Sequence, residues 1–166
     1  KPDAQTEAIL GHGLSAFSCE PMKDWQAFEA AAGAVITQSQ DGLWQPISDE
    51  RIRAVMPMAG EGWWLWGQKG LAAVQKPVLV IAATKDELYN ENVLIFEHLG
   101  SPQKTFLSIV NKDHMMIFET KYEKIIAHFA AAFFEYHLKN KEEMIWYYSP
   151  ELINGNADVS WGITTQ

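Results

Sequence analysis

The stretch that decides the fold is KPVLVIAATKDELYNENV, residues 76–93. An apolar run from Val78 to Ala83 stops at a Thr-Lys-Asp-Glu sequence, which leads into a helix-like segment that ends at Gly100. A continuous apolar run of this length is typical of a strand buried on both faces of a parallel sheet. The stretch therefore predicts a strand over 78–83 that delivers Asp86 at its carboxyl end.

Two other segments extend this pattern. KTFLSIVNKDHMMIF, residues 104–118, predicts a strand over 105–110 followed by His114, and RIRAVMPMAG, residues 51–60, predicts a strand over 52–58. Alternation of strands with helical segments predicts three parallel strands joined by crossover helices, an α/β fold. Ligands of such sheets bind beyond the carboxyl ends of the strands, where Asp86 and His114 both lie.

Composition excludes several classes of function. The 166 residues carry a formal charge of −8 and show no basic run, so nucleic acid is not an expected partner. No apolar stretch approaches the ~20 residues of a membrane span, and no leader opens the sequence, so we expect a soluble protein of unassigned compartment. The single cysteine, Cys19, excludes an internal disulfide and a cysteine-based zinc site, and we expect no metal or organic cofactor.

Three segments together resemble a known family. They are SDERIRAVMPMAG (48–60), WGQKGLAAVQKPVLVIAATKDELY (66–89) and FEHLGSPQKTFLSIVNKDHMMIF (96–118). From about residue 49 to residue 139 the chain resembles the carboxyl-terminal half of an α/β-hydrolase of the dienelactone-hydrolase-like esterases. The resemblance implies that Asp86 is the acid and His114 the base of a serine-hydrolase triad, in which the chain order is nucleophile, acid, histidine.

The nucleophile half of that family has no counterpart here. The motif G-x-S-x-G is absent, and the nearest sequence, GLSAF at 13–17, has Phe17 where a close strand–helix approach needs the second glycine. Ser15 is thus a poor candidate nucleophile. We expect residues 1–48 to be a cap or loop region with one helix from Met22, residues 49–139 the hydrolase half, and residues 140–166 an aromatic and then polar extension.

Each candidate also has a structural interpretation. Asp86 could cap the following helix, and His114 could be a loop histidine bonded to Asp113. We expect GWWLWG, residues 62–67, to lie in an aromatic loop, and its tryptophans, which are Trp63, Trp64 and Trp66, could pack the fold or line an acyl pocket. Cys19 has no nearby histidine in the sequence and is interpreted as structural, or as half of a disulfide to a missing segment.

The expected function follows from these residues. We expect the acid-and-base half of a serine ester hydrolase acting on a small-molecule ester, inactive alone because another segment supplies the serine. Three strands would leave an open sheet edge near Ile52–Met58, which we expect a second polypeptide or a second copy to cover. The alternative is a non-catalytic binding module, or a truncated fragment, derived from an α/β-hydrolase.

Overall fold

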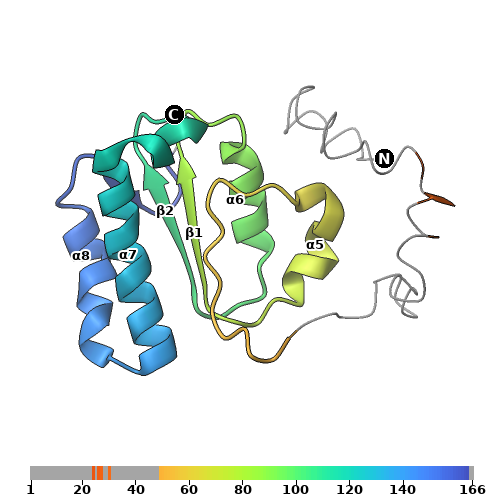
Figure 1. The fold of residues 1–166 in the computed structure, drawn as a ribbon, viewed down its shortest axis with the longest axis horizontal. Helices are drawn as coiled ribbons and strands as arrows, with labels where there is room; N and C mark the ends of the chain where they lie inside the picture. Colours follow the sequence, from red (N-terminus) through yellow and green to blue (C-terminus); the bar gives the residue numbers. More distant parts are fainter. Residues whose placement is uncertain (1–23, 25, 28–29, 31–48, 165–166) are drawn as a thin grey trace.

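A computed structural model describes residues 49–164 and, before them, positions 24, 26, 27 and 30 (Figure 1). Ser15 and Cys19 lie outside the described residues, as does most of the predicted cap region with its helix. Elements keep the labels of Figure 1.

Two parallel strands form the centre of the fold, as the sequence predicts. Strand β1 (Val78–Ala83) pairs with β2 (Lys104–Ile109) over their full lengths, from Val78 opposite Lys104 to Ala83 opposite Ile109. Helix α6 (Tyr89–His98) is the crossover between them. Both strands therefore end at the same side of the sheet, which positions the residues that follow them.

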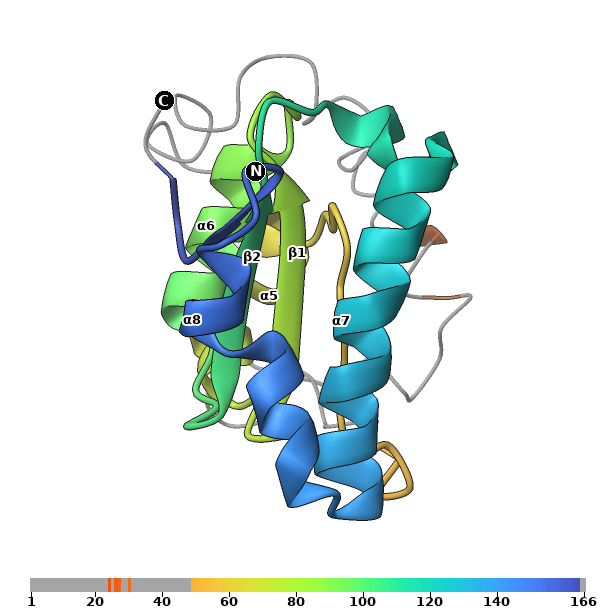
Figure 2. The same cartoon turned by 90° about the vertical axis from the view of Figure 1, so that its left-hand side faces the viewer.

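Helices cover both faces of the sheet (Figures 1 and 2). One layer contains α7 (Thr120–Lys139), the 3-10 helix η3 (Glu142–Tyr148) and α8 (Pro150–Ile153), and the other contains α5 (Trp63–Ala72) and α6. Successive β1 side chains point to opposite layers: Leu79 packs toward α7 and Val80 toward α6. Burial on both sides explains the unbroken apolar run of β1. None of the described helices is long and apolar enough to cross a membrane.

The segment predicted as a strand over 52–58 is extended but does not form a regular strand. It makes two isolated parallel bridges to β1, Val55 with Val78 and Met58 with Ile81. Between these bridges a regular ladder would need the N–H of residue 57 to donate to the Leu79 carbonyl, and Pro57 has no N–H. The proline therefore divides the ladder in two.

The third strand of the sheet comes instead from the C-terminal region. Strand β3 (Val159–Trp161) pairs antiparallel with β2, so the order is β1–β2–β3 and the expectation of three parallel strands is wrong for the third. The described part of the predicted extension, residues 140–164, accordingly belongs to the fold, because η3, α8 and β3 pack against the core. Ile153 and Val159 are both buried.

The aromatic segment that we expected to be a loop is helix α5, kinked at Gly67, where φ is 56°. No side chain at Gly62 caps this helix. Its first turn is instead bonded by α6: the Glu91 carboxyl accepts from the N–H groups of Gly62 (2.7 Å) and Trp63 (2.8 Å). The helix thus begins where a distant carboxyl satisfies its free N–H groups.

Candidate active site

Asp86 lies in the turn that follows β1. Its backbone closes the turn, because the Asp86 N–H donates to the Ala83 carbonyl and the Tyr89 N–H donates to the Asp86 carbonyl, both at 3.0 Å. One side-chain oxygen, Oδ1, accepts from the Leu88 N–H at 2.8 Å. The expectation that Asp86 caps the following helix is therefore wrong, because the N-cap of α6 is Leu88 and no side chain bonds there. Oδ1 instead bonds the turn that precedes the helix, and the second oxygen remains for another partner.

His114 begins the 3-10 helix η2 (His114–Phe118), which follows β2. The residue before it, Asp113, caps this short helix: its Oδ1 accepts from the Met115 N–H at 2.9 Å. Asp113 therefore fixes the turn on which His114 stands, and the side chain bonded to the imidazole is that of Asp86, not Asp113.

Two hydrogen bonds join the loops that carry Asp86 and His114. The Thr84 hydroxyl accepts from the Asn111 N–H at 2.9 Å, and the Lys85 N–H donates to the Lys112 carbonyl at 2.8 Å. Asn111 has φ of 58°, a left-handed conformation that asparagine tolerates better than most residues. The two loops form one bonded unit at the carboxyl end of the sheet.

The central contact of the site joins Asp86 Oδ2 to His114 Nδ1 at 3.0 Å. The carboxyl side chain is 0% exposed and the imidazole side chain 52% exposed. Because a carboxylate can only accept, Nδ1–H is the donor, and in a neutral imidazole the other nitrogen, Nε2, is then the acceptor. Within the described residues His114 makes no other hydrogen bond, so Nε2 is available to accept a proton.

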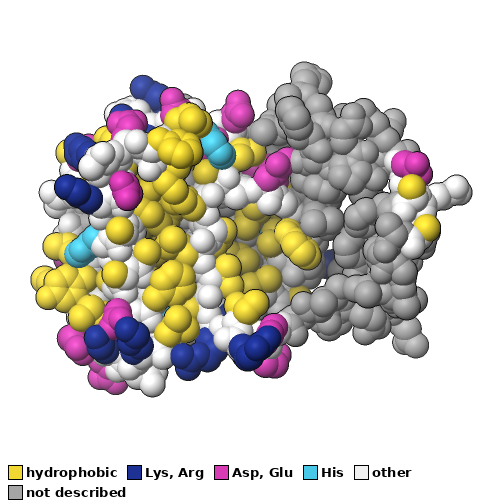
Figure 3. Space-filling model, in the orientation of Figure 1, with side chains coloured by type: hydrophobic (Ala, Val, Ile, Leu, Met, Phe, Trp, Pro, Cys, Tyr) yellow, Lys and Arg dark blue, Asp and Glu magenta, His cyan; other side chains and the backbone are white. Residues whose placement is uncertain are grey.

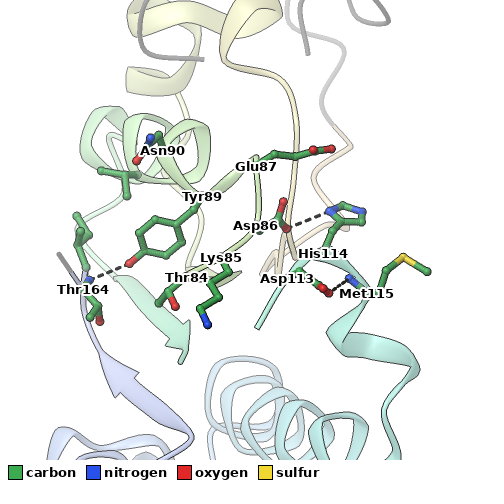
Figure 4. A pocket seen from close by; sticks show the side chains of 12 residues that line it. Thr84, Lys85, Asp86, Glu87, Tyr89, Asn90, Asp113, His114, Met115 and Thr164 are labelled. Carbon is green, nitrogen blue, oxygen red and sulfur yellow. Dashed lines mark hydrogen bonds and ion pairs between the residues drawn. The ribbon is translucent and has the colours of Figure 1, made fainter. Parts of the chain in front are cut away.

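The pair lies beside an open hollow of about 1100 Å³ (Figure 4). Asp86 and His114 stand at one end of it, and Tyr89 and Thr164 at the other. Its remaining lining residues are Thr84, Lys85, Glu87, Asn90, Val93, Asp113, Met115 and Ile163. Residues from both strand ends, from α6 and from the C-terminal segment therefore share one cavity.

The sequence did not point to most of this lining. Tyr89 and Val93 lie four residues apart on α6, a spacing that places them on one helix face beside Asp86. No pattern in the sequence marks Ile163 and Thr164, which lie beyond β3.

The tryptophans predicted as possible pocket residues lie elsewhere or are not described. Trp63 contacts His98, with ring centroids 4.7 Å apart and ring planes tilted by 51°, and Trp66 is 54% exposed. Neither lines the hollow. The side chain of Trp64 is outside the described residues, so its part in a pocket remains a prediction.

The arrangement can orient an imidazole and accept a proton at Nε2, which is the work of a general base in acyl transfer. Among the described residues no serine, threonine or cysteine side chain is bonded to that imidazole. The described part of the chain contains no cluster of three or more metal-ligating side chains.

A search with models of known protein families and a search of curated proteins each found no match to this chain.

Proposed function

We propose that this chain is the acid-and-base half of a serine ester hydrolase. One observation supports the proposal above all: a fully buried carboxyl bonds, at 3.0 Å, to the Nδ1 of a half-exposed imidazole at the ends of two adjacent parallel strands. Buried acid, oriented base and free Nε2 are the features that activation of a hydroxyl needs.

In this mechanism His114 Nε2 takes the proton of a serine hydroxyl as its oxygen attacks the ester carbonyl carbon. The imidazolium then gives that proton to the leaving alkoxide, and the acyl group stays on the serine. Water then gives a proton to Nε2 as its oxygen attacks the acyl carbon, and the imidazolium returns that proton to the serine oxygen as the carboxylic acid leaves. Asp86 stays ionised throughout, and it fixes the tautomer and stabilises the imidazolium.

The serine is supplied by a second polypeptide, or a second copy, that adds to the edge formed by residues 52–58. The N–H and the carbonyl of Val55 both point toward β1. The N–H donates to the Pro77 carbonyl (2.9 Å), and the carbonyl accepts from the Leu79 N–H (3.0 Å). In extended backbone the N–H and carbonyl of the next residue, Met56, point the opposite way. Ile52 is 54% and Val55 39% exposed, and Figure 3 shows hydrophobic side chains on both sides of this segment. Such an edge favours pairing with another strand.

The test is labelling of the tagged chain, purified from cells with whatever accompanies it, by a fluorophosphonate probe that modifies activated serines. The intact mass of every polypeptide is then measured. A label on a second polypeptide, lost when His114→Ala replaces the native chain, supports the proposal. A label on Ser15 places the nucleophile in this chain. No label on any polypeptide contradicts hydrolase function and favours a non-catalytic binding module.

A further inference from the structure

The three residues after β3, Gly162–Thr164, form one wall of the hollow, which we call the tail wall. It is fixed by buried hydroxyl groups. The Thr164 N–H donates to the Tyr89 hydroxyl and the Ser108 hydroxyl donates to the Gly162 carbonyl, each at 2.8 Å. Tyr89 and Ser108 are themselves bonded at 2.8 Å. A turn at Gly162, with φ of 83°, leads the chain from the strand into this position.

The direction of these hydrogen bonds follows from the donors available. Ser108 has one hydroxyl proton and gives it to Gly162, so the Tyr89 hydroxyl must be the donor to Ser108. Tyr89 then receives the Thr164 N–H on its own oxygen. Tyr89 is 6% and Ser108 0% exposed, so both hydroxyl groups depend mainly on these protein partners. Tyr89, which bonds Thr164 directly and donates to Ser108, thus positions the tail wall together with Ser108.

Apolar side chains contribute to the end of the hollow between α6 and the tail wall. Tyr89 and Val93 line it from α6, and Ile163, 40% exposed, lines it from the tail wall, beside the polar Asn90 and Thr164. Met115, 58% exposed, lies beside His114 near the other end. The exposed isoleucine, the valine and the tyrosine ring leave apolar surface in the hollow that a ligand can cover.

The charges around the hollow disfavour an anionic ligand. The titratable groups that line it are Asp86, Glu87, Asp113, Lys85, His114 and the Tyr89 hydroxyl. Three carboxyl groups thus face one ammonium group, and the whole chain carries −8. A negatively charged ligand meets net repulsion there, whereas an uncharged one does not.

We infer that the tail wall and α6 form a subsite for the uncharged acyl or alkoxy group of an ester, with Tyr89 as its positioning residue. This inference rests on the proposed function, because it assigns the rest of the hollow to the substrate whose carbonyl lies near His114. It predicts that the chain binds short uncharged esters in preference to carboxylates of the same length.

The ligand test uses the full chain with labelled Ile and Val methyl groups and two probes of seven carbons each, dipropyl ketone and heptanoate. The ketone mimics an uncharged ester but cannot be hydrolysed. We expect it to shift the Ile163 and Val93 signals saturably, and heptanoate to bind at least about tenfold more weakly. Equal binding of the two probes, or no response of Ile163 to the ketone, would overturn the inference.

The positioning role is tested with Tyr89→Phe, which keeps the ring and removes the hydroxyl. We expect the Thr164 amide to exchange with solvent at least about tenfold faster and ketone affinity to fall, while the amides of β1 keep their protection. General loosening of the fold would accelerate the β1 amides equally and would contradict a specific role. Tyr147→Phe, at a 44% exposed tyrosine on η3, is the matched control.

A second pair of variants tests the wall without altering a buried residue. Ile163→Ser should weaken ketone binding by about fourfold for each methylene lost from contact, whereas Ile145→Ser, at a 49% exposed isoleucine of η3, should not. Equal effects of the two variants would refute the subsite. All these readings are made without turnover, so the subsite can fail while the Asp86–His114 pair is upheld, and the reverse.

Discussion

Asp86 uses its two carboxyl oxygens for two different tasks. Oδ1 accepts from the Leu88 N–H and stabilises the turn after β1, while Oδ2 faces the His114 ring. Because the side chain is fully buried, each oxygen needs a partner, and the structure provides one for each. Bonding the turn before α6 is therefore compatible with orienting the His114 ring.

Replacing Asp86 with asparagine tests the orientation of the imidazole directly. In the native chain we expect the neutral His114 ring to carry its proton on Nδ1, because the carboxylate can only accept. In Asp86→Asn the amide can turn its NH₂ group toward Nδ1, which favours the proton on Nε2. Nitrogen-15 chemical shifts of the ring distinguish the two tautomers, and a native chain protonated on Nε2 would disprove the assigned geometry.

Gly100 shows how one residue can be predicted correctly for the wrong reason. The sequence marks it as the end of a helix, yet its φ is not in the left-handed region. A Cβ at this position would lie 2.0 Å from the Ala72 carbonyl oxygen, at the end of α5. Close approach of α5 to the end of α6, rather than backbone freedom, requires the glycine.

We expect Gly100→Ala to destabilise the chain by at least about 2 kcal/mol, because the clash is with backbone that can move only if α5 shifts. Urea unfolding followed by tryptophan fluorescence measures the change. Gly155→Ala is the control, since its nearest contact would be an ordinary 3.4 Å. Equal stabilities for the two variants would show that α5 can shift at no cost.

At the scale of the element, helix α5 depends on α6. Its first two N–H groups are bonded by Glu91, which is 1% exposed and lies 28 or 29 residues further along the chain. The burial of Glu61 and its proximity to Glu91 raise the pKa of the Glu61 carboxyl. Nothing local in GWWLWG marks a helix start, which is why the sequence favoured a loop there.

Glu91→Ala should therefore cost about 2–3 kcal/mol of stability, since it leaves two N–H groups at the start of α5 without their acceptor. Urea unfolding and the amide exchange of Trp63 measure the effect. Glu97→Ala, at an exposed position of the same helix, should change stability by less than about 0.5 kcal/mol. An equally small effect of Glu91→Ala would mean that α5 does not need α6 for its start.

Because Tyr148 of η3 is buried against α7, we expect the free energy of unfolding to fall at alkaline pH. Burial beside Phe133 and Tyr136 raises the pKa of the Tyr148 hydroxyl to about 12. The unfolded chain releases this proton near pH 10 and the folded chain keeps it. Between pH 10 and about 12 the unfolded state binds fewer protons, so the free energy of unfolding falls by at most about 1.4 kcal/mol per pH unit.

Urea unfolding from about pH 9 to about pH 12 measures this decline. We expect the free energy of unfolding of Tyr148→Phe to decline less steeply with pH than that of the native chain. That of Tyr147→Phe, at the exposed neighbouring residue, should decline as in the native chain. A Tyr148→Phe variant with the native slope would assign the decline to other groups.

At the scale of the whole molecule, the sequence predicted the features that are marked by a pattern of neighbouring residues. The bounds of β1 and the positions of Asp86 and His114 follow from apolar runs that stop at polar residues. Strand β3 carries no such signal, because three residues in an Asn- and Gly-rich region become a strand only by pairing with β2, about fifty residues earlier. The tail wall, and with it the contribution of Ile163 and Thr164 to the hollow, was therefore not predictable.

The open edge at residues 52–58 predicts different rates of amide exchange for two neighbouring residues. In the isolated chain the Met56 amide should exchange within about tenfold of an unstructured amide, while the Val55 amide, bonded to Pro77, should exchange at least about a hundredfold more slowly. Hydrogen exchange read by NMR measures both. Strong protection of Met56 in a monomeric chain would show that the edge is already covered.

The two edges of this sheet differ, and the difference limits stoichiometry. The β2 side is closed by β3, a strand of three residues followed by the turn at Gly162, too short to template further addition. Within residues 49–164, the segment 52–58 is thus the edge that is open to strand addition. If the proposed partner pairs there, one open edge per molecule limits the assembly to a dimer, with itself or with another chain, and prevents growth into a fibril.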